Sequence, residues 1–196
     1  NFVALNQVSV AFQPGKLTAI IGPSGTGKST LIRILAGLEL PDTGQITFDG
    51  AAVSLTSPAA AEDLGLRFLH QELQIVPALS VAENMHLAHP YPSFGFGLVN
   101  WPALHAATQA ALDRLGVSHI DPTVTMADLG PGDQMLTRIA ATLIDTQGPH
   151  PWAYVLDEPT AALTGAEAER LFTALHTLRA AGHAILYVSH RMDEVL

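Results

Sequence analysis

The chain contains no cysteine, which excludes disulfides, thiolate catalysis and cysteine-ligated metal sites. No apolar run approaches the roughly 18 residues that a membrane-spanning helix needs. The N-terminal segment shows no signal-peptide pattern, although the missing initiator methionine leaves room for residues upstream. Together these absences predict a soluble, cytoplasmic protein.

Charge is also scarce in this sequence. Charged residues make up 14% of the 196 residues and apolar residues 48%, whereas about a quarter of an average chain is charged. Such a surface fits a protein that partners partly cover, and it equally fits an alanine-rich chain whose small residues raise the apolar count. The net charge of −9 argues against a nucleic-acid surface, because phosphate binding needs clustered Lys and Arg.

Strand and helix patterns alternate at both ends of the chain. Short apolar runs predict buried strands at 17–22, 64–71, 152–159 and 183–190. Helical spacing follows at 28–38 and again at 164–182, where Thr164 and Glu167 form a capping box and Gly182 a stop. A short alternating segment at 45–48 lies between turn signals. This order predicts an α/β fold with a mainly parallel sheet covered by helices.

The middle of the chain has a different pattern. Residues 80–88 and 102–117 carry helical spacing and are joined by an irregular segment at 89–100. We therefore predict an α/β core formed by residues 1–71 and 151–196, with residues 72–150 inserted as a helical subdomain. A chain of this length can accommodate one domain with such a subdomain.

One glycine-rich segment fits the phosphate-loop pattern G-x-x-x-x-G-K-[ST] between a predicted strand and a predicted helix. Its glycines allow backbone N–H groups to surround phosphate oxygens, and the helix N-terminus adds positive potential. Lys28 would reach the β- and γ-phosphates, and Ser29 would ligate Mg²⁺. A purely structural turn is the alternative reading. The predicted phosphate-binding residues are Gly22, Pro23, Ser24, Gly25, Thr26, Gly27, Lys28, Ser29 and Thr30.

Polar residues close the other predicted strands. Asp157 and Glu158 follow one apolar strand, where an aspartate can hold Mg²⁺ and a glutamate can accept a proton from water. Gln71 and His190 close two more strands. In an open parallel sheet these ends face one ligand crevice, so the four side chains are expected together. Each of them alone would be an ordinary strand-end residue.

The phosphate loop, Gln71, "VLDEPT" and "YVSH" together resemble the ATP-binding cassette ATPases over nearly the whole chain. Three longer segments, at 70–88, 157–172 and 187–196, are similar to the N-terminal cassette of tandem ATPase subunits of bacterial monosaccharide importers. The resemblance implies an ATPase with ATP and Mg²⁺ as cofactors. Catalytic roles fall on Lys28, Gln71, Glu158 and His190, and metal roles on Ser29, Gln71 and Asp157.

The same resemblance implies the partners. A second cassette would pack head to tail with this one, either on the same polypeptide or as a homodimer. Transmembrane permease subunits would bind it, and a substrate-binding protein would act indirectly. The location implied is peripheral, on the cytoplasmic face of the membrane. Residues 72–84, with Ile75, Val76 and Leu79, are the candidate permease contact or, alternatively, core.

Residues Leu129 to Gln134 depart from the family signature Leu-Ser-Gly-Gly-Gln, which closes over ATP held by the partner cassette. We call this segment the degenerate signature. Gly130 lacks the hydroxyl, Pro131 has no N–H to donate, and Asp133 adds negative charge where a triphosphate should arrive. We expect an intact phosphate loop but a weak or silent signature. The alternative is a signature that still works through Gly132 and the helix dipole.

Other departures concern the ends of the chain. The family's adenine-stacking aromatic lies before the first residue, and Phe2 is a poor substitute. Only "RMDEVL" follows the last strand, which indicates a truncated cassette. Two alternative functions stay open: a regulatory cassette with little hydrolysis, favoured by the degenerate signature, and a DNA-repair or translation cassette, disfavoured by the acidic charge balance.

Two further patterns carry less weight. Nine histidines suggest metal, but of these only His86 and His89 are close and no third ligand is evident. We expect scattered histidines instead. The aromatic residues at 91–101 are read as a packed connection in the helical subdomain, with a membrane-contact patch as the alternative.

Overall fold

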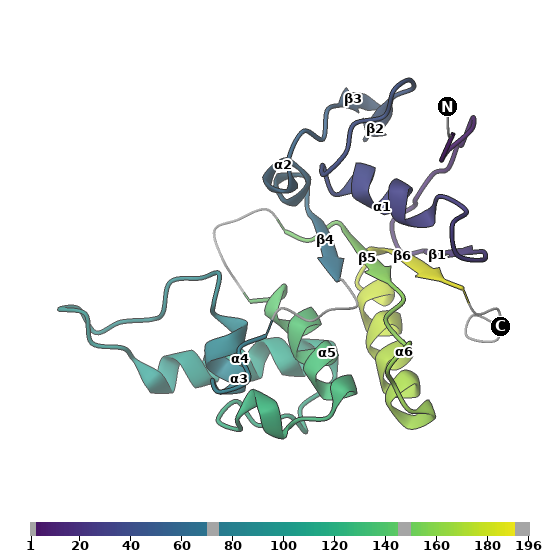
Figure 1. Cartoon of the computed structure of the whole chain (residues 1–196). Coiled ribbons are helices and arrows are strands. Elements are labelled where there is room, and N and C mark those ends of the chain that lie inside the picture. The colour runs from purple at the N-terminus through teal and green to yellow at the C-terminus, as the bar shows by residue number, and fades with distance from the viewer. Residues whose placement is uncertain (1–2, 70–74, 145–149, 191–196) are drawn as a thin grey trace. The chain divides into compact units, whose positions relative to one another are not determined.

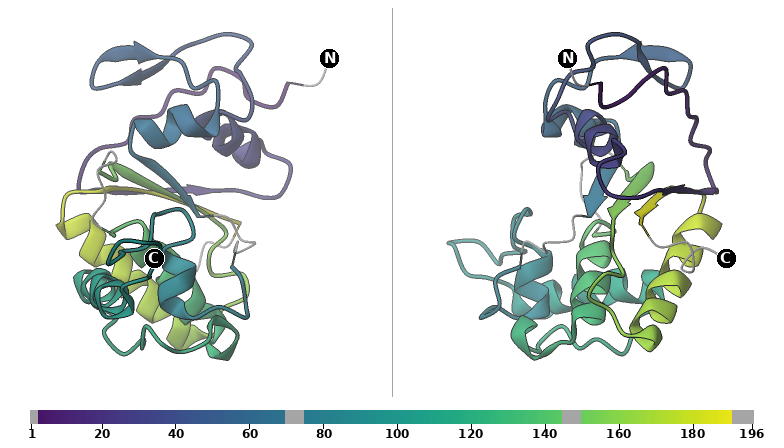
Figure 2. Two further views of the ribbon diagram at one scale, coloured as in Figure 1. Left: turned by 90° about the vertical axis from the view of Figure 1, so that its left-hand side faces the viewer. Right: turned by 45° about the vertical axis from the view of Figure 1, so that its right-hand side comes forward.

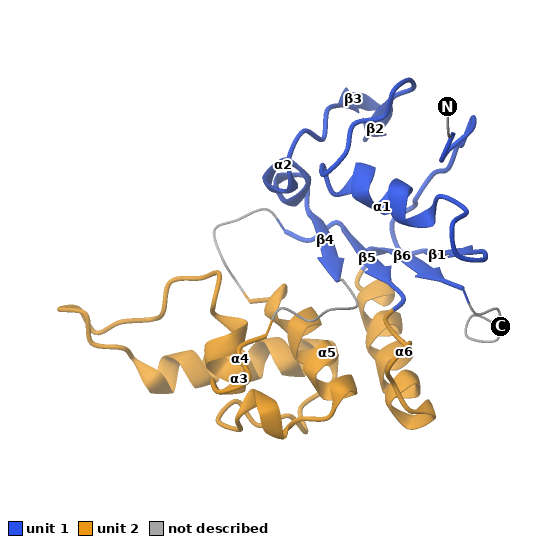
Figure 3. Ribbon diagram, in the orientation of Figure 1, with its two compact units in different colours: residues 1–70, 148–158, 182–196 blue, residues 71–147, 159–181 orange. Residues whose placement is uncertain are grey.

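The computed structural model describes residues 3–69, 75–144 and 150–190. The chain forms two compact units, shown in different colours in Figure 3. Unit 1 contains residues 1–70, 148–158 and 182–196, and unit 2 contains residues 71–147 and 159–181. This division differs from the expected one in the segment 159–181, which groups with the helical unit. Gln71 lies outside the described residues.

Unit 1 is built on a four-stranded parallel sheet in the order β1-β6-β5-β4. The strands are β1 (Leu17–Ile21), β4 (Leu66–Leu69), β5 (Ala153–Asp157) and β6 (Ala184–Ser189), which confirms the four predicted strands (Figure 1). The two central strands are buried almost throughout, as expected where a parallel sheet is covered on both faces. All four strands therefore point their carboxyl ends to one edge.

Helix α1 (Lys28–Leu35) packs on this sheet. Its Ile32 joins Val155, Leu186 and Val188 in a buried cluster, against which Phe12, Ile20, Leu35 and Phe68 also pack. The helix ends before the predicted residue 38, because Gly37 adopts a left-handed φ of 67° and closes the last turn. The hydrophobic cluster thus fixes α1 on the sheet and, with it, the loop that leads into the helix.

The remainder of unit 1 is a hairpin and a short helix. Strands β2 (Ile46–Phe48) and β3 (Ala51–Val53) pair antiparallel. Asp49 and Gly50 join them with positive φ at both residues, which suits a two-residue hairpin turn. Helix α2 (Pro58–Asp63) begins at the Ser57 cap. Helices α1 and α2 lie between this hairpin and the four-stranded sheet (Figures 1 and 2).

Unit 2 is helical, in agreement with the sequence pattern. It contains α3 (Val81–Met85), α4 (Trp101–Leu115), a 3₁₀ turn η1 (Met126–Asp128), α5 (Pro131–Ala141) and α6 (Gly165–Ala180). Helix α5 packs against α3, α4 and α6. The buried side chains that form this core include Leu104, Leu112, Leu136, Ile139, Leu171 and Leu175.

The predicted fold class is confirmed: a parallel sheet core, a small antiparallel part and a helical unit are all present. Within the residues that the structure describes, no helix is long and apolar enough to cross a membrane.

Candidate nucleotide-binding site

The predicted phosphate loop joins the carboxyl end of β1 to the start of α1. Gly27 caps α1 with a left-handed φ of 91°. A Cβ at this position would lie 2.3 Å from the carbonyl oxygen of Ala4 and 2.9 Å from Cδ2 of Leu5. Gly25 also has a positive φ, of 83°. Glycine is therefore required at Gly27 both for its conformation and because the Ala4–Leu5 segment leaves no space for a side chain.

Lys28 is held at the mouth of this loop by the loop's own backbone. Its ammonium donates hydrogen bonds to the carbonyl oxygens of Gly22 and Pro23, the latter at 2.8 Å. The Thr26 hydroxyl donates to the same Pro23 oxygen at 2.9 Å. The positive charge consequently lies beside the N-terminus of α1, whose amides add positive potential of their own.

A pocket of about 240 Å³ opens in front of the loop. Six of the nine predicted phosphate-binding residues line it, together with Glu158 and Ala4. The pocket brings a basic, amide-rich wall and one carboxylate into contact with the same space. The six loop residues are Ser24, Gly25, Gly27, Lys28, Ser29 and Thr30.

Glu158 and His190 meet at the carboxyl ends of β5 and β6. The Oε1 atom of Glu158 lies 3.0 Å from Nδ1 of His190. Parallel pairing of Asp157 with Val188 brings both residues to this edge, and the amide of Glu158 donates to the carbonyl oxygen of Val188 at 2.9 Å. Sequence reasoning expected both residues at one crevice, and the structure places them in direct contact.

The donor set suits a nucleotide with a divalent cation. Ser29 offers a hydroxyl at the pocket, and Asp157 ends β5 immediately before Glu158. Oxygen donors of this kind are those that Mg²⁺ prefers. Gly27 lines the pocket and immediately precedes the first amides of α1, which can bind phosphate oxygens. The residues present therefore fit Mg-ATP.

One residue that lines this pocket was not predicted from the sequence, and one predicted site residue, Gln71, lies outside the described residues. Ala4, from the segment before β1, lines the pocket but carries no chemical signal in the sequence. The roles predicted for Gln71 remain predictions, because that residue is not described.

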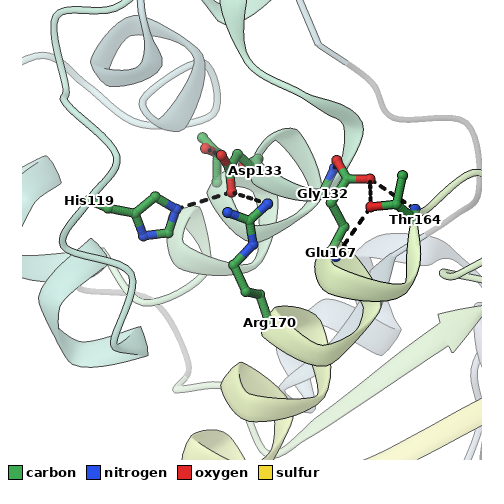
Figure 4. Close-up of polar contacts among 7 residues, drawn as sticks. His119, Gly132, Asp133, Thr164, Glu167 and Arg170 are labelled. Atoms are coloured by element: carbon green, nitrogen blue, oxygen red, sulfur yellow. Dashed lines mark hydrogen bonds and ion pairs between the residues drawn. The ribbon is translucent and has the colours of Figure 1, made fainter.

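The degenerate signature forms the start of α5 in unit 2 (Figure 4). Asp133 does not stand alone there: its Oδ1 lies 3.1 Å from Nε2 of His119 and 3.7 Å from the Arg170 guanidinium. The side-chain amide of Gln134 donates to the carbonyl oxygens of Met126 and Leu129. The acidic residue that the sequence flagged as repulsive therefore has a polar partner in His119 and a cation beside it in Arg170, two residues that the sequence gave no reason to select.

The structure also describes the histidine pair and the aromatic residues at 91–101 that the sequence singled out. His86 is 3% exposed, its Nδ1 lies 2.9 Å from the Ala82 carbonyl oxygen, and burial lowers the pKa of its imidazole. Among the described residues no three His, Cys, Asp or Glu side chains form a metal-binding group. In the 91–101 segment Tyr91 packs edge-on against Trp101. The expected packed connection is wrong for Phe94 and Phe96, which are exposed, and Trp101 is itself 44% exposed.

Residues 72–74 of the candidate permease segment lie outside the described residues, and the remainder is partly exposed. Val76 is exposed, whereas Ile75 and Leu79 are intermediate. Its role as a contact for a membrane partner stays a prediction.

Comparisons with known proteins identify relatives of this chain. The chain is 42% identical over 193 residues to a ribose import ATP-binding protein of Streptomyces avermitilis, a match that covers 98% of this chain and 37% of the relative. It is 40% identical to the ribose import ATP-binding protein of Corynebacterium glutamicum, covering 97% of this chain and 35% of the relative. The chain thus spans little more than a third of the length of these relatives.

Solved structures also resemble the fold of this chain. The ADP conformation of an ATP-binding cassette of an ABC transporter matches with a TM-score of 0.80 and 28% identity, covering 98% of this chain and 77% of that one. A nucleotide-free ATP-binding cassette matches with a TM-score of 0.79 and 27% identity, with the same coverage. A family model described as ABC transporter matches residues 5–161. From the phosphate loop to the Asp157–Glu158 strand end, the chain belongs to the ABC transporter family.

Proposed function

We propose that this chain binds Mg-ATP and, when paired with a second cassette, hydrolyses it to drive the import of a sugar. The observation that carries the proposal is the pocket in which the phosphate loop faces Glu158, with His190 in contact with that carboxylate. A phosphate-binding wall and a carboxylate placed to act on water are two of the parts that ATP hydrolysis uses.

Each side chain has a chemical task in this proposal. Lys28 and the amides at the start of α1 bind the β- and γ-phosphates and stabilise the charge that develops on the transferred group. Ser29 and Asp157 would hold Mg²⁺, which supplies further neutralisation of the phosphates when bound. Gln71 would contact the metal and the attacking water, as the family resemblance implies.

Glu158 acts as the general base on the attacking water. Its contact with His190 fixes one carboxylate oxygen and leaves the other for the water proton. His190 would also orient the γ-phosphate, so that the base and the phosphoryl group keep one relative position. Positioning of this kind, more than covalent chemistry, accelerates phosphoryl transfer.

The wider assignment draws on the relatives. Those named as ribose import ATP-binding proteins cover nearly all of this chain at about 40% identity, which supports a sugar importer. Permease subunits and an indirect substrate-binding protein would then be partners, and the chain would lie at the cytoplasmic face of the membrane. The second cassette would be supplied by the same polypeptide or by another copy.

The degenerate signature supports one alternative, a regulatory cassette with little hydrolysis. The names of the relatives do not favour it. Single-turnover ATPase measurements on the assembled complex separate the two. Replacing Gly130→Ser together with Pro131→Gly should raise the rate if the signature limits turnover, and an unchanged rate would count against a weak signature.

The two lysines of the chain provide a matched test of the proposed function. Lys28→Ala removes the ammonium from the phosphate loop, whereas Lys16→Ala removes the same charge from an exposed position just before β1. Titration calorimetry with Mg-ATP should show tight binding to the wild type and to Lys16→Ala, and binding weaker by about tenfold or more for Lys28→Ala, because a charge-assisted contact is lost. Absence of binding to the folded wild-type chain would overturn the proposal.

A further inference from the structure

One carboxylate, that of Glu167, contacts the first turns of two helices (Figure 4). Its Oε2 accepts hydrogen bonds from the Thr164 amide at 2.9 Å and from the Thr164 hydroxyl at 2.8 Å, which completes the capping box of α6. Its Oε1 accepts a hydrogen bond from the Gly132 amide at 3.1 Å, in the first turn of α5. Glu167 therefore joins the start of its own helix to the degenerate signature.

Helix α5 depends on an acceptor from elsewhere because its own cap residue provides none. Gly130 has no side chain to accept a hydrogen bond, and Pro131 has no N–H. The first amide that this helix can offer is thus the one on Gly132. Glu167 places an anion at the position where the positive end of the helix dipole attracts one.

The contact is close enough to require glycine. A Cβ on Gly132 would lie 2.7 Å from Cβ and 2.8 Å from Cγ of Glu167. Three hydrogen bonds lower the pKa of Glu167. The one from the Thr164 amide has the largest effect, and those from the Thr164 hydroxyl and the Gly132 amide come next. The side chain is consequently a carboxylate at neutral pH.

We propose that Glu167 occupies the Gly132 amide as an internal anion and so weakens the closure of the degenerate signature on ATP held by a second cassette. This inference rests on the proposed function, in which the signature faces that nucleotide. A γ-phosphate oxygen and the Glu167 carboxylate need the same N–H group, and their negative charges repel each other. Asp133 contributes less repulsion, because the Arg170 guanidinium already lies beside it.

Glu167→Gln separates the two capping roles. The amide side chain has one oxygen, and Thr164 offers two donors to it whereas Gly132 offers one. The oxygen should therefore stay with Thr164 and release the Gly132 amide, while the charge is removed. Thr164→Ala is the matched control, since it perturbs the α6 cap but leaves the carboxylate on Gly132.

The readout is the ATP dependence of hydrolysis by the assembled complex with its second cassette. Glu167→Gln should lower the KM for ATP by about threefold or more, with kcat unchanged or raised, whereas Thr164→Ala should keep the wild-type KM. A KM that does not fall in Glu167→Gln, or that falls equally in Thr164→Ala, would overturn the proposal.

A second measurement needs neither the partner nor a substituted chain. In the folded wild-type chain the amide NMR shift of Gly132 should move with the ionisation of Glu167 as the pH falls below the carboxyl range, and an unresponsive amide would refute the inference. Failure of the wild-type chain to bind Mg-ATP would instead refute the proposed function and leave this contact standing.

Discussion

Glu158 adopts a left-handed backbone conformation, with φ of 49°, that a residue with a side chain rarely takes. Such a conformation costs about 1–2 kcal/mol, so the surrounding structure must hold it. The hydrogen bond from its amide to Val188 and the contact with His190 do so. Strain of this kind at a pocket residue indicates that the direction of the carboxylate matters more than local stability.

Replacing Glu158→Gln should retain Mg-ATP binding and lower turnover by roughly 10²- to 10⁴-fold, because the amide cannot accept the water proton. Single-turnover hydrolysis by the assembled complex measures the effect. Glu62→Gln, at an exposed position on α2, is the matched charge control and should hydrolyse ATP at the wild-type rate. Equal turnover in Glu158→Gln and the wild type would remove the base assignment.

Site residues that belong to a sequence motif or end a strand were predictable from the sequence. Contacts between segments far apart in the chain were not. The phosphate loop, Glu158 and His190 follow from spacing and strand ends. Glu167 was recognised as a cap for α6, but its second contact, with Gly132, depends on how α5 packs against α6. No local pattern encodes that packing, and the same holds for the pairing of Asp133 with Arg170.

At the scale of elements, Gly37 shows why α1 ends where it does. Its φ of 67° is left-handed, and a Cβ there would lie 2.4 Å from the carbonyl oxygen of Ser57. Gly116 also follows a helix, with φ of 79°, but a Cβ there meets nothing within 4 Å. The two glycines share a conformation and differ in the space beside them.

Gly37→Ala should therefore destabilise the chain more than Gly116→Ala does. Both variants are expected to lose about 1–2 kcal/mol from the strained backbone, and Gly37→Ala should lose about 1–3 kcal/mol more from the clash with backbone that cannot move aside. Urea unfolding of each variant gives the difference in unfolding free energy. Equal losses would show that the Ser57 segment shifts freely.

His86 is the C-cap residue of helix α3, and its burial makes stability depend on pH. Because burial lowers the pKa of this imidazole from the ordinary value of 6.5, the unfolded chain binds more protons than the folded chain in the range just below 6.5. The stabilising contribution is complete above pH 6.5 and is lost progressively as the pH falls through that range.

His86→Asn should flatten this pH dependence, because an amide can donate to the Ala82 carbonyl oxygen as Nδ1–H does and has no proton to gain. Thermal unfolding between pH 7.5 and 5.5 provides the measurement, and His176→Asn, exposed on α6, should keep the wild-type slope. If both variants retain that slope, His86 does not set the acid sensitivity of unit 2.

Elements with a clear periodic pattern were predicted well, in contrast to two that are at least half alanine. The helix predicted at 164–182 forms as α6 with the expected capping box. Strand β3 and helix α2 were missed because their alanine-rich sequences, AAV and PAAAED, show no contrast between apolar and polar faces. The strand order β1-β6-β5-β4 was also beyond the pattern, since it depends on contacts between segments far apart in the chain.

At the scale of the whole molecule, a ligand that binds only the folded state stabilises it. Mg-ATP at about 100 times its Kd adds about 2.7 kcal/mol, which for a chain of this size raises the Tm by about 5–10 °C. Differential scanning calorimetry should show this rise with Mg-ATP and a smaller one with ATP and a chelator. A rise that is equal with and without Mg²⁺ would show that Ser29 and Asp157 do not hold a metal.

The scarcity of lysine has a practical consequence for experiments on this chain. Acetic anhydride or another amine-modifying reagent meets two lysine side chains: exposed Lys16, and Lys28, which is only partly exposed and hydrogen-bonded to loop carbonyl oxygens. Bound nucleotide would shield Lys28 from the reagent and leave Lys16 as reactive as before. The ratio of the two modified peptides in a mass spectrum therefore reports occupancy of the phosphate loop directly, with an internal reference present in every molecule.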